Sequence, residues 1–339
     1  MKRVLQILFL LLVVSVVAFF LYQRSQDDGS VINPDNLKRK VPVAAEDYEL
    51  IPRDELLHDT AVARDMWKVL KTRYAEHFKD LIGRMKEAGV KPLYCWMTTE
   101  VGVSETPLQA ASKPFIRALC RQYEIPFVDF SDLFIGREPT EITHMPKDGH
   151  LNEQGALLVA ERMAKIIQRY QNHRATAHYP DSDRPRLMGE LDPDQDRVAT
   201  GGVGIPYRLI TNSAGLRMKR EVRFDSTGQR ILLMGDSGFY FPFIDNAETP
   251  RALLQKQFPQ KEVLNVSNWG YTLTDYKWQW NERAKYLEPD LVLLQSSGDD
   301  IADLYFTHQR RFSRARGQKS FRPAPVEKAF YEYLENLEK

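Results

Sequence analysis

Ile231-Leu-Leu-Met-Gly-Asp-Ser237-Gly238 is the stretch that decides the fold, because an apolar run leads directly into a polar turn. A short continuous apolar run of this kind is typical of a strand that is buried on both faces of a parallel sheet. Gly235 and Gly238 allow a tight turn at the end of that strand, which would expose the Ser237 hydroxyl. We therefore expect Ser237 at the carboxyl edge of a sheet, where open α/β folds place their sites.

Strands and helices alternate on both sides of this turn. The expected strands span residues 91–97, 125–130, 231–234, 262–266 and 290–295. The expected helices span residues 59–89, 107–123, 152–170, 249–258 and 274–286. This alternation predicts an α/β fold in which a doubly wound parallel sheet lies between two helical layers, a three-layer sandwich.

We expect a single composite domain over residues 59–339. Residues 59–170 and 205–339 each supply too few strands for a sheet of their own, so both are expected to contribute strands to one sheet. Residues 171–204 are polar and contain several Pro and Gly residues, and we interpret them as a connector.

The amino terminus predicts a membrane anchor. Residues 4–22 are apolar apart from Gln6 and Ser15, and a helix of that length crosses the hydrocarbon core of a bilayer. A cleavable signal peptide is the competing interpretation, but the apolar run continues beyond the best cleavage candidate, Val16-Val-Ala18. We therefore expect an uncleaved transmembrane anchor within residues 1–25.

Charge next to this segment predicts its orientation. Lys2 and Arg3 precede the apolar run, which places the N-terminus in the cytoplasm by the positive-inside rule. The chain is then expected to be a single-pass membrane protein, with a polar tether over residues 26–58 and its folded domain outside the cytoplasm.

Composition and cysteine content indicate which partners and cofactors to expect. A net charge of +1 with 27% charged residues gives no indication of nucleic acid binding. Cys95 and Cys120 lie in apolar segments and are interpreted as buried small hydrophobes, although an exported location would permit a disulfide. His144 and His150 have no Cys or His partner at ligand spacing, so we expect no metal and no cofactor.

Asp148-Gly149-His150 suggests a second catalytic element, upstream of Ser237. A histidine before a helix is more often a cap or a surface side chain, so the spacing of its neighbours decides the interpretation. Two residues apart in a loop, Asp148 can accept a hydrogen bond from one imidazole nitrogen and leave the other free to act as a base. His144 has Ile142 at the corresponding position and is discounted.

Taken together, these blocks resemble those of the SGNH (GDSL) hydrolases. Gly235-Asp-Ser237 resembles their nucleophile block and Asp148-Gly-His150 their acid–base block. The other similar segments are residues 207–217, which precede the nucleophile strand, and residues 263–272 and 289–304, which resemble the second and third blocks. The resemblance implies an SGNH-like sandwich in which Ser237 is the nucleophile, His150 the base and Asp148 the acid.

The resemblance also implies an oxyanion site. The backbone N–H groups of Ser237 and Gly270 are expected to hold the oxyanion, but the Asn of the third block is Asp299 here. An ionised carboxylate cannot donate a hydrogen bond. Either Asp299 is protonated, or it points away, or another donor such as Ser297 or Asn268 replaces it.

In most SGNH proteins the serine block comes first, and here the order is reversed. This permuted order behind an anchor is similar to the alginate O-acetyltransferase-like branch, whose members are periplasmic and acetylate or deacetylate exopolysaccharide. Those proteins usually have Trp after the His, where this chain has Leu151. A circular permutant of an ordinary GDSL esterase is an equal alternative.

The resemblance leads us to expect a membrane-anchored serine esterase or O-acyltransferase that acts on acylated, in particular acetylated, carbohydrate. Trp269, Asn268 and Tyr240 are candidate substrate contacts, and an envelope polysaccharide system is a candidate partner. The alternative is a catalytically inactive glycan-binding or scaffold subunit. A lipid-directed esterase is a third interpretation, favoured by the anchor and by the basic segment at residues 310–322.

Overall fold

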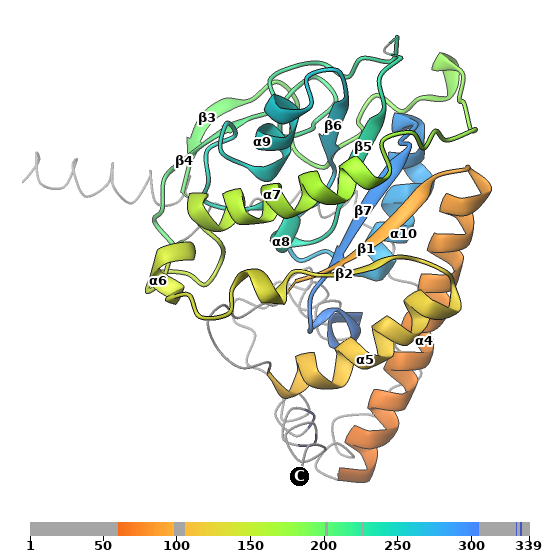
Figure 1. Ribbon diagram of the computed structural model, residues 1–339, viewed down its shortest axis with the longest axis vertical. Coiled ribbons are helices and arrows are strands. Elements are labelled where there is room, and N and C mark those ends of the chain that lie inside the picture. Colours follow the sequence, from red (N-terminus) through yellow and green to blue (C-terminus); the bar gives the residue numbers. More distant parts are fainter. Residues whose placement is uncertain are drawn as a thin grey trace, which may run out of the picture.

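The computed structural model describes residues 60–97, 106–200, 203–225 and 227–304, together with residues 330 and 333. Within that part the chain has the predicted α/β architecture, with helices on both faces of a parallel sheet (Figure 1). The expected anchor, the tether and the basic segment at residues 310–322 lie outside the described residues. No helix in the described ranges combines the length and the apolar character needed to cross a membrane.

Five parallel strands form the central sheet, in the order β2-β1-β7-β5-β6. They are β1 (Lys91–Trp96), β2 (Phe127–Asp129), β5 (Arg230–Met234), β6 (Glu262–Asn265) and β7 (Leu291–Ser296). Strand β1 pairs with β7 along its full length, from Lys91 opposite Leu291 to Trp96 opposite Ser296. Strands from the two halves of the sequence therefore meet at the centre of one sheet.

Each strand sends alternate side chains into two different cores, as the period of a strand requires. One core lies under α4 (Thr60–Glu87), α5 (Pro107–Gln122) and α10 (Leu273–Glu282). The other lies under α7 (Glu153–Arg169) and α9 (Pro250–Gln257), on the opposite face. The shorter helical elements are α6 (Pro139–Ile142), α8 (Ser237–Tyr240), η2 (Ser131–Leu133), η3 (Asp181–Asp183) and η4 (Ala284–Leu287).

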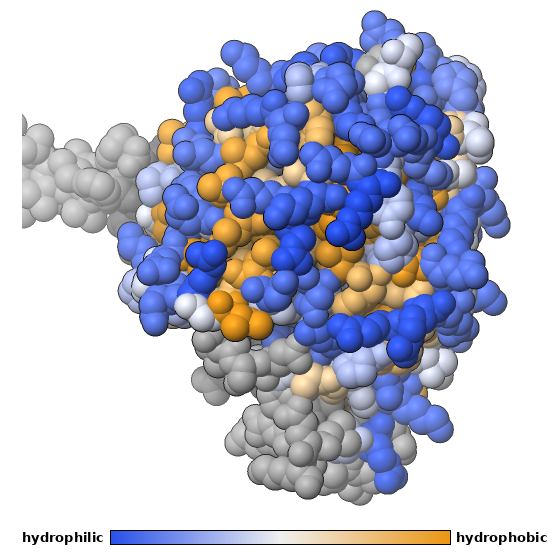
Figure 2. Space-filling model, viewed as in Figure 1, coloured by the Kyte–Doolittle hydropathy of each residue, from blue (hydrophilic) through white to orange (hydrophobic). Residues whose placement is uncertain are grey.

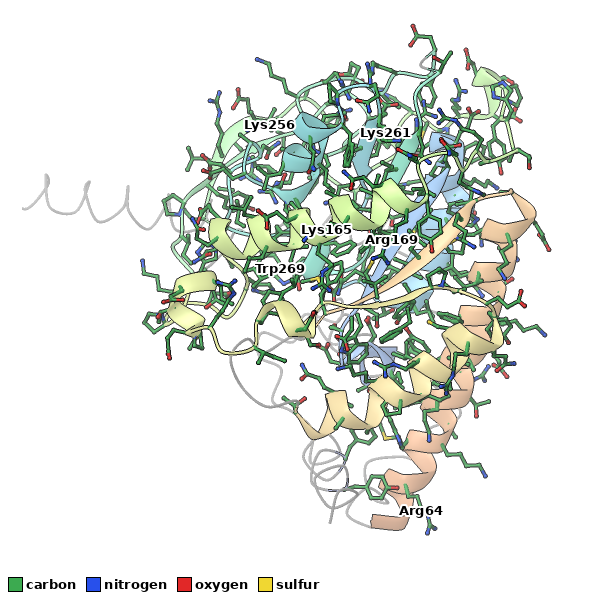
Figure 3. The ribbon with its side chains drawn as sticks, in the orientation of Figure 1. Arg64, Lys165, Arg169, Lys256, Lys261 and Trp269 are labelled. Carbon is green, nitrogen blue, oxygen red and sulfur yellow. The ribbon has the colours of Figure 1, made fainter. Side chains whose placement is uncertain are left out.

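Helix α7 has one buried and one exposed face, as its amphipathic sequence predicts. Its Met163 and Ile167 are buried in the core, whereas Lys165 and Arg169 are exposed on the outer surface (Figure 3). The amphipathic spacing thus covers the sheet on one side and faces solvent on the other. Figure 2 shows this face of the molecule, on which charged and polar residues predominate and apolar side chains appear between them.

The interpretation of residues 171–204 as a connector alone is incomplete. They contain β3 (Asp196–Ala199), which pairs antiparallel with β4 (Tyr207–Ile210) in a small second sheet. Three of the four residues of β3 are exposed, so the segment lacks the alternation of apolar and polar residues that would indicate a strand. The inward side of this sheet packs against Phe243 and reaches Trp269.

The two cysteines are free thiols, each buried in a different core. Cys95 on β1 packs under α7, and Cys120 on α5 packs on the opposite face of the sheet. They behave as small apolar side chains, and burial raises the pKa of the Cys120 thiol to about 12.

Candidate active site

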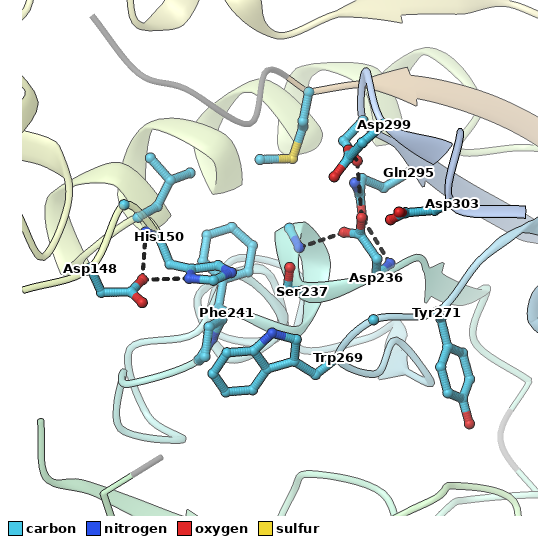
Figure 4. Close-up of a pocket in the computed structure, with 17 residues that line it drawn as sticks. Asp148, His150, Asp236, Ser237, Phe241, Trp269, Tyr271, Gln295, Asp299 and Asp303 are labelled. Carbon is cyan, nitrogen blue, oxygen red and sulfur yellow. Dashed lines mark hydrogen bonds and ion pairs between the residues drawn. The ribbon is translucent and has the colours of Figure 1, made fainter. Parts of the chain in front are cut away.

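A cavity of about 390 Å³ opens at the carboxyl ends of the central strands (Figure 4). Its lining includes Asp148, His150, Ser237, Trp269, Gly270 and Asp299. The structure therefore brings the predicted acid–base block, which precedes the nucleophile strand by a long stretch of sequence, to the same cavity as Ser237. The first and second halves of the chain each contribute a wall of this site.

The turn after β5 presents Ser237 to the cavity. Asp236 caps the short helix α8, because its Oδ1 accepts a hydrogen bond from Gly238 N at 2.6 Å. Asp236 N donates to Gln295 Oε1 at 3.0 Å. A Cβ on Gly235 would lie 2.4 Å from that same Oε1, so a larger residue there would displace the turn.

His150 is held by Asp148 in the orientation that a general base requires. Asp148 Oδ1 lies 2.5 Å from His150 Nδ1 and also accepts from His150 N at 2.8 Å. Because a carboxylate is an acceptor, we assign the ring proton to Nδ1, which leaves Nε2 free to accept a proton. Ser237 and the His150 ring both face the cavity (Figure 4), although no hydrogen bond joins them in the described structure.

Two aromatic rings brace the imidazole of His150. The Trp269 ring meets it edge-on at 5.4 Å between centroids, and the Phe243 ring does so at 6.0 Å. Phe243 is buried and has a φ of +65°, in the left-handed region that non-glycine residues rarely occupy. Strained residues persist where surrounding structure determines them, often at functional sites.

Arg217 supplies that surrounding structure. Its Nη1 donates to Tyr240 O and to Phe241 O, each at 2.8 Å, and its Nη2 donates to Ile244 O. The Arg217 side chain is buried, so these carbonyls take the place of solvent around its charge. The loop that carries Phe243 onto His150 is thereby fixed. Neither Arg217 nor Phe243 was predicted to be a site residue from the sequence, although Arg217 ends the block at residues 207–217.

The loop after β6 places Gly270 beside the nucleophile turn. Asn268 N donates to Gly235 O at 3.2 Å, and Asn268 Oδ1 accepts from Trp269 N at 2.9 Å. Gly270 has a φ of +65°, a conformation that favours glycine. Gly270 thus lines the cavity together with Ser237, as the predicted pair of oxyanion donors requires.

Two of the predicted substrate contacts do not line the cavity. Tyr240 is buried and its ring lies against the Arg217 guanidinium, 4.9 Å away. Asn268 is also buried, and it borders a separate, smaller cavity with Tyr240. Tyr240 ends the short helix α8 on its inner side, which explains why a residue near Ser237 in sequence points away from it. Trp269 does line the main cavity.

Carboxyl groups occupy the side of the cavity opposite His150. The Ser297 hydroxyl lies 2.5 Å from Asp299 Oδ1 and 3.0 Å from Asp236 Oδ2, and Ser297 N donates to Asp300 Oδ2 at 2.7 Å. A serine hydroxyl has one hydrogen, so the second of its two contacts is a hydrogen bond only when a carboxyl carries a proton. Asp299 therefore lies in the cavity, among like charges.

The electrostatics of this cluster favour protonation. Burial, and then the charge of Asp299, raise the pKa of Asp236 to about 6. Burial, followed by the charges of Asp236 and Asp299, raises the pKa of Asp300 well above its ordinary value. These shifts are typical of carboxyls that share a site and cannot all ionise together. Beside His150, burial lowers the pKa of His144, which packs edge-on against Phe243.

Comparisons with known proteins give matches in structure only. No protein-family model and no curated protein matches this chain. The chain is similar to the O-acetyltransferase domain of Pseudomonas putida AlgJ, with 13% identity, a TM-score of 0.39, and coverage of 76% of this chain and 93% of that one. It is also similar to Bacillus cereus PatB1, with 13% identity, a TM-score of 0.39, and coverage of 68% and 90%.

Proposed function

We propose that this protein is an SGNH-type serine esterase or O-acyltransferase, with Ser237 as nucleophile, His150 as base and Asp148 as the acid that orients it. The observation that carries the proposal is the Asp148–His150 pair at 2.5 Å, whose free Nε2 belongs to the cavity that Ser237 also lines. An acid, a base and a hydroxyl in one cavity at the carboxyl edge of a sheet are the parts that acyl transfer needs.

The proposed mechanism proceeds through an acyl-enzyme. Ser237 attacks the ester carbonyl while His150 takes its proton, and Asp148 stabilises the imidazolium that forms. The N–H groups of Ser237 and Gly270 bind the oxyanion, and each such donor commonly contributes a few kcal/mol. His150 then returns the proton to the leaving alcohol. Water completes hydrolysis, or a sugar hydroxyl completes transfer.

The proposed setting is the periplasmic face of the inner membrane, with residues 4–22 as the anchor and acetylated carbohydrate of an envelope polysaccharide system as substrate. Support for the anchor comes from the length of the apolar run. Trp269 in the cavity supports a carbohydrate, because an aromatic ring can pack on the apolar face of a sugar.

The test is turnover of p-nitrophenyl acetate by the full chain in detergent, beside Ser237→Ala and His150→Ala. The expected result is loss of the activity by at least about 10³-fold in both variants, since members of a triad act as a unit. Circular dichroism controls for folding. Equal rates in the three folded proteins would exclude the triad.

A second candidate function is a catalytically inactive glycan-binding or scaffold subunit. The observation that favours it is Asp299, a carboxyl in the cavity where SGNH enzymes have a hydrogen-bond donor. This candidate predicts no turnover by the wild type above the Ser237→Ala variant, together with retained binding of an oligosaccharide.

A further inference from the structure

Arg217 and Arg230, whose side chains are buried, are each held by several hydrogen-bond acceptors. Arg230 Nε donates to Glu262 Oε2 at 2.9 Å, and its Nη1 donates to Leu287 O at 2.7 Å. Arg217 donates to the carbonyls of the loop that follows α8. A charge that is removed from water needs such partners, because the cost of its desolvation is otherwise not offset. A partly buried arginine without them is therefore a candidate ligand-binding group.

Arg251 is an arginine of this kind. It lies in the first turn of α9 and is only partly exposed. Its Nε is inaccessible to solvent and has no hydrogen-bond partner. Across the described ranges of the chain, its two Nη atoms form no hydrogen bond or ion pair either, and they remain accessible. The side chain is therefore buried as far as Nε, whereas the tip of the guanidinium can be reached by a ligand.

A second guanidinium lies over the same face of α9. Gln255 follows Arg251 by about one helical turn, and residues four apart lie on the same side of a helix. Arg220 Nη2 donates to Gln255 Oε1 at 2.7 Å, and that oxygen also accepts from Val263 N at 3.1 Å. Arg220 is thus held beside Arg251 by an acceptor that is neutral and does not offset its charge.

The positive charges of these two arginines act against each other. Burial, and then the charge of Arg220, lower the pKa of Arg251 to about 10. Burial, and then the charge of Arg223, lower the pKa of Arg220, and Glu262 opposes this change. The Glu262 carboxylate is already engaged, since it accepts from Arg230 Nε and from Arg223 N. An anion bound between Arg220 and Arg251 would therefore relieve repulsion as well as accept hydrogen bonds.

We propose that Arg220 and Arg251 form a binding site for a phosphate group. A phosphate monoester carries about 1.5 to 2 negative charges at neutral pH, which matches two guanidinium groups, and its oxygens accept hydrogen bonds from the planar fork of each. A carboxylate has a single charge and offsets only one of them. Neither arginine lines the cavity of Ser237. The site is therefore separate from the proposed active site, and its test does not depend on ester turnover.

The test measures the melting temperature of the full chain in detergent, by intrinsic fluorescence, as the concentration of inorganic phosphate is raised. Sodium chloride keeps the ionic strength constant. Acetate replaces phosphate in a second series, and glycerophosphoglycerol, the soluble headgroup of a phospholipid, replaces it in a third. We expect phosphate at about ten times its Kd to raise the melting temperature by about 2–4 °C, because a ligand that binds only the folded state stabilises it.

The rise should be lost in Arg251→Gln and in Arg220→Gln. It should persist in the matched control Arg169→Gln, which removes an exposed arginine on α7 (Figure 3). Exclusion of phosphate from protein surfaces also stabilises folded proteins, but it does so equally in all four proteins, so the difference between them measures the site. Each protein is compared with itself in chloride. If Arg251→Gln does not fold, Arg220→Gln decides the matter, since Arg220 is exposed.

The source of the phosphate group is read from the same melts. A larger Arg251-dependent rise with inorganic phosphate supports a free phosphate or a phosphate monoester as the ligand. A larger one with glycerophosphoglycerol supports a lipid headgroup, whose phosphodiester has one charge. A rise of equal size in the wild type and both variants would overturn the proposal. So would the absence of any rise above chloride with either phosphate compound, or an equal rise in acetate.

Discussion

Buried charged side chains have different partners at the two ends of the central sheet. At the amino end, Arg230 Nε donates to Glu262 Oε2 at 2.9 Å, and both side chains are buried. Asp290, also at that end, accepts from Arg174 at 3.1 Å and from Arg230 N at 2.7 Å. At the carboxyl end, Asp236 and Asp300 face other carboxyls instead.

The charged side chains at the amino end support the fold, whereas those at the carboxyl end are available for chemistry. Paired and hydrogen-bonded charges inside a protein mainly fix its structure. Carboxyls grouped without cations cost stability, and such groups are characteristic of functional sites. We call the amino end the structural end and the carboxyl end, where the proposed active site lies, the chemical end. Substitutions at the two ends should have different consequences.

The largest effect is expected at the chemical end, for Asp148→Asn. An amide at this position can donate to His150 Nδ1, which would leave the ring proton on Nε2 and prevent it from accepting the proton of Ser237. We expect ester turnover to fall by about 10³–10⁴-fold, with a melting temperature close to that of the wild type. A steady-state assay and a thermal melt check this. Turnover within a few fold of the wild type would show that Asp148 does not orient the base.

At the structural end, Arg230→Met is expected to reduce the free energy of unfolding by about 3–5 kcal/mol, because it removes the buried guanidinium that pairs with the buried Glu262 carboxylate. Urea unfolding monitored by fluorescence measures it. The double variant Arg230→Met with Glu262→Leu should recover most of that loss. A single variant as stable as the wild type would contradict the pairing.

An intermediate effect with a specific pH dependence is expected for Asp236→Asn. The folded state binds the Asp236 proton more tightly than the unfolded state, because the pKa rises from 3.8 to about 6 on folding. The wild type should therefore lose stability as the pH rises from about 4 to about 6, by up to about 3 kcal/mol.

The Asp236→Asn variant should lack this loss, because the Asn side chain does not ionise. Its amide oxygen can still accept the hydrogen bond that caps α8. Unfolding free energies measured across that pH range give the comparison. The exposed Asp132→Asn serves as control, since Asp132 pairs with Arg162 at the surface. If the unfolding free energies of the wild type and of Asp236→Asn changed with pH in the same way, a raised pKa of Asp236 would be ruled out.

The smallest effect is expected for Arg174→Gln at the structural end. Half of the Arg174 side chain is exposed in its ion pair with Asp290, and pairs of this kind contribute about 0.2–1 kcal/mol. Urea unfolding in low and in high salt measures the change. A loss as large as that for Arg230→Met would mean that burial does not set the difference between the two pairs.

Much of the fold could be predicted because local signals agree with the final structure. The apolar run at residues 231–234 is strand β5, and Asn152 caps α7 as expected, with its Oδ1 accepting from Gln154 N and Gly155 N. Strand β3 could not be predicted, because its residues are mostly exposed and its partner β4, rather than its own pattern, makes it a strand.

The site could be predicted only where the spacing of residues in the sequence brings their side chains together. Asp148 and His150 form the expected pair because two residues in a turn suffice to bring them together. The role of Arg217 depends on carbonyls of a loop that follows a later strand, and Tyr240 turns inward at the end of α8. Neither arrangement is expressed in the local sequence, since both depend on tertiary packing.

The pairing of β1 with β7 has a consequence for how the chain reaches its fold. During synthesis β1 and β2 can pair early, but the other edge of β1 must wait for β7, which follows it by about 200 residues. Contacts so far apart in sequence slow folding. An apolar strand edge that waits unpaired is a template for association with other chains. This edge of β1 is therefore open to such association until β7 has been synthesised and pairs with it.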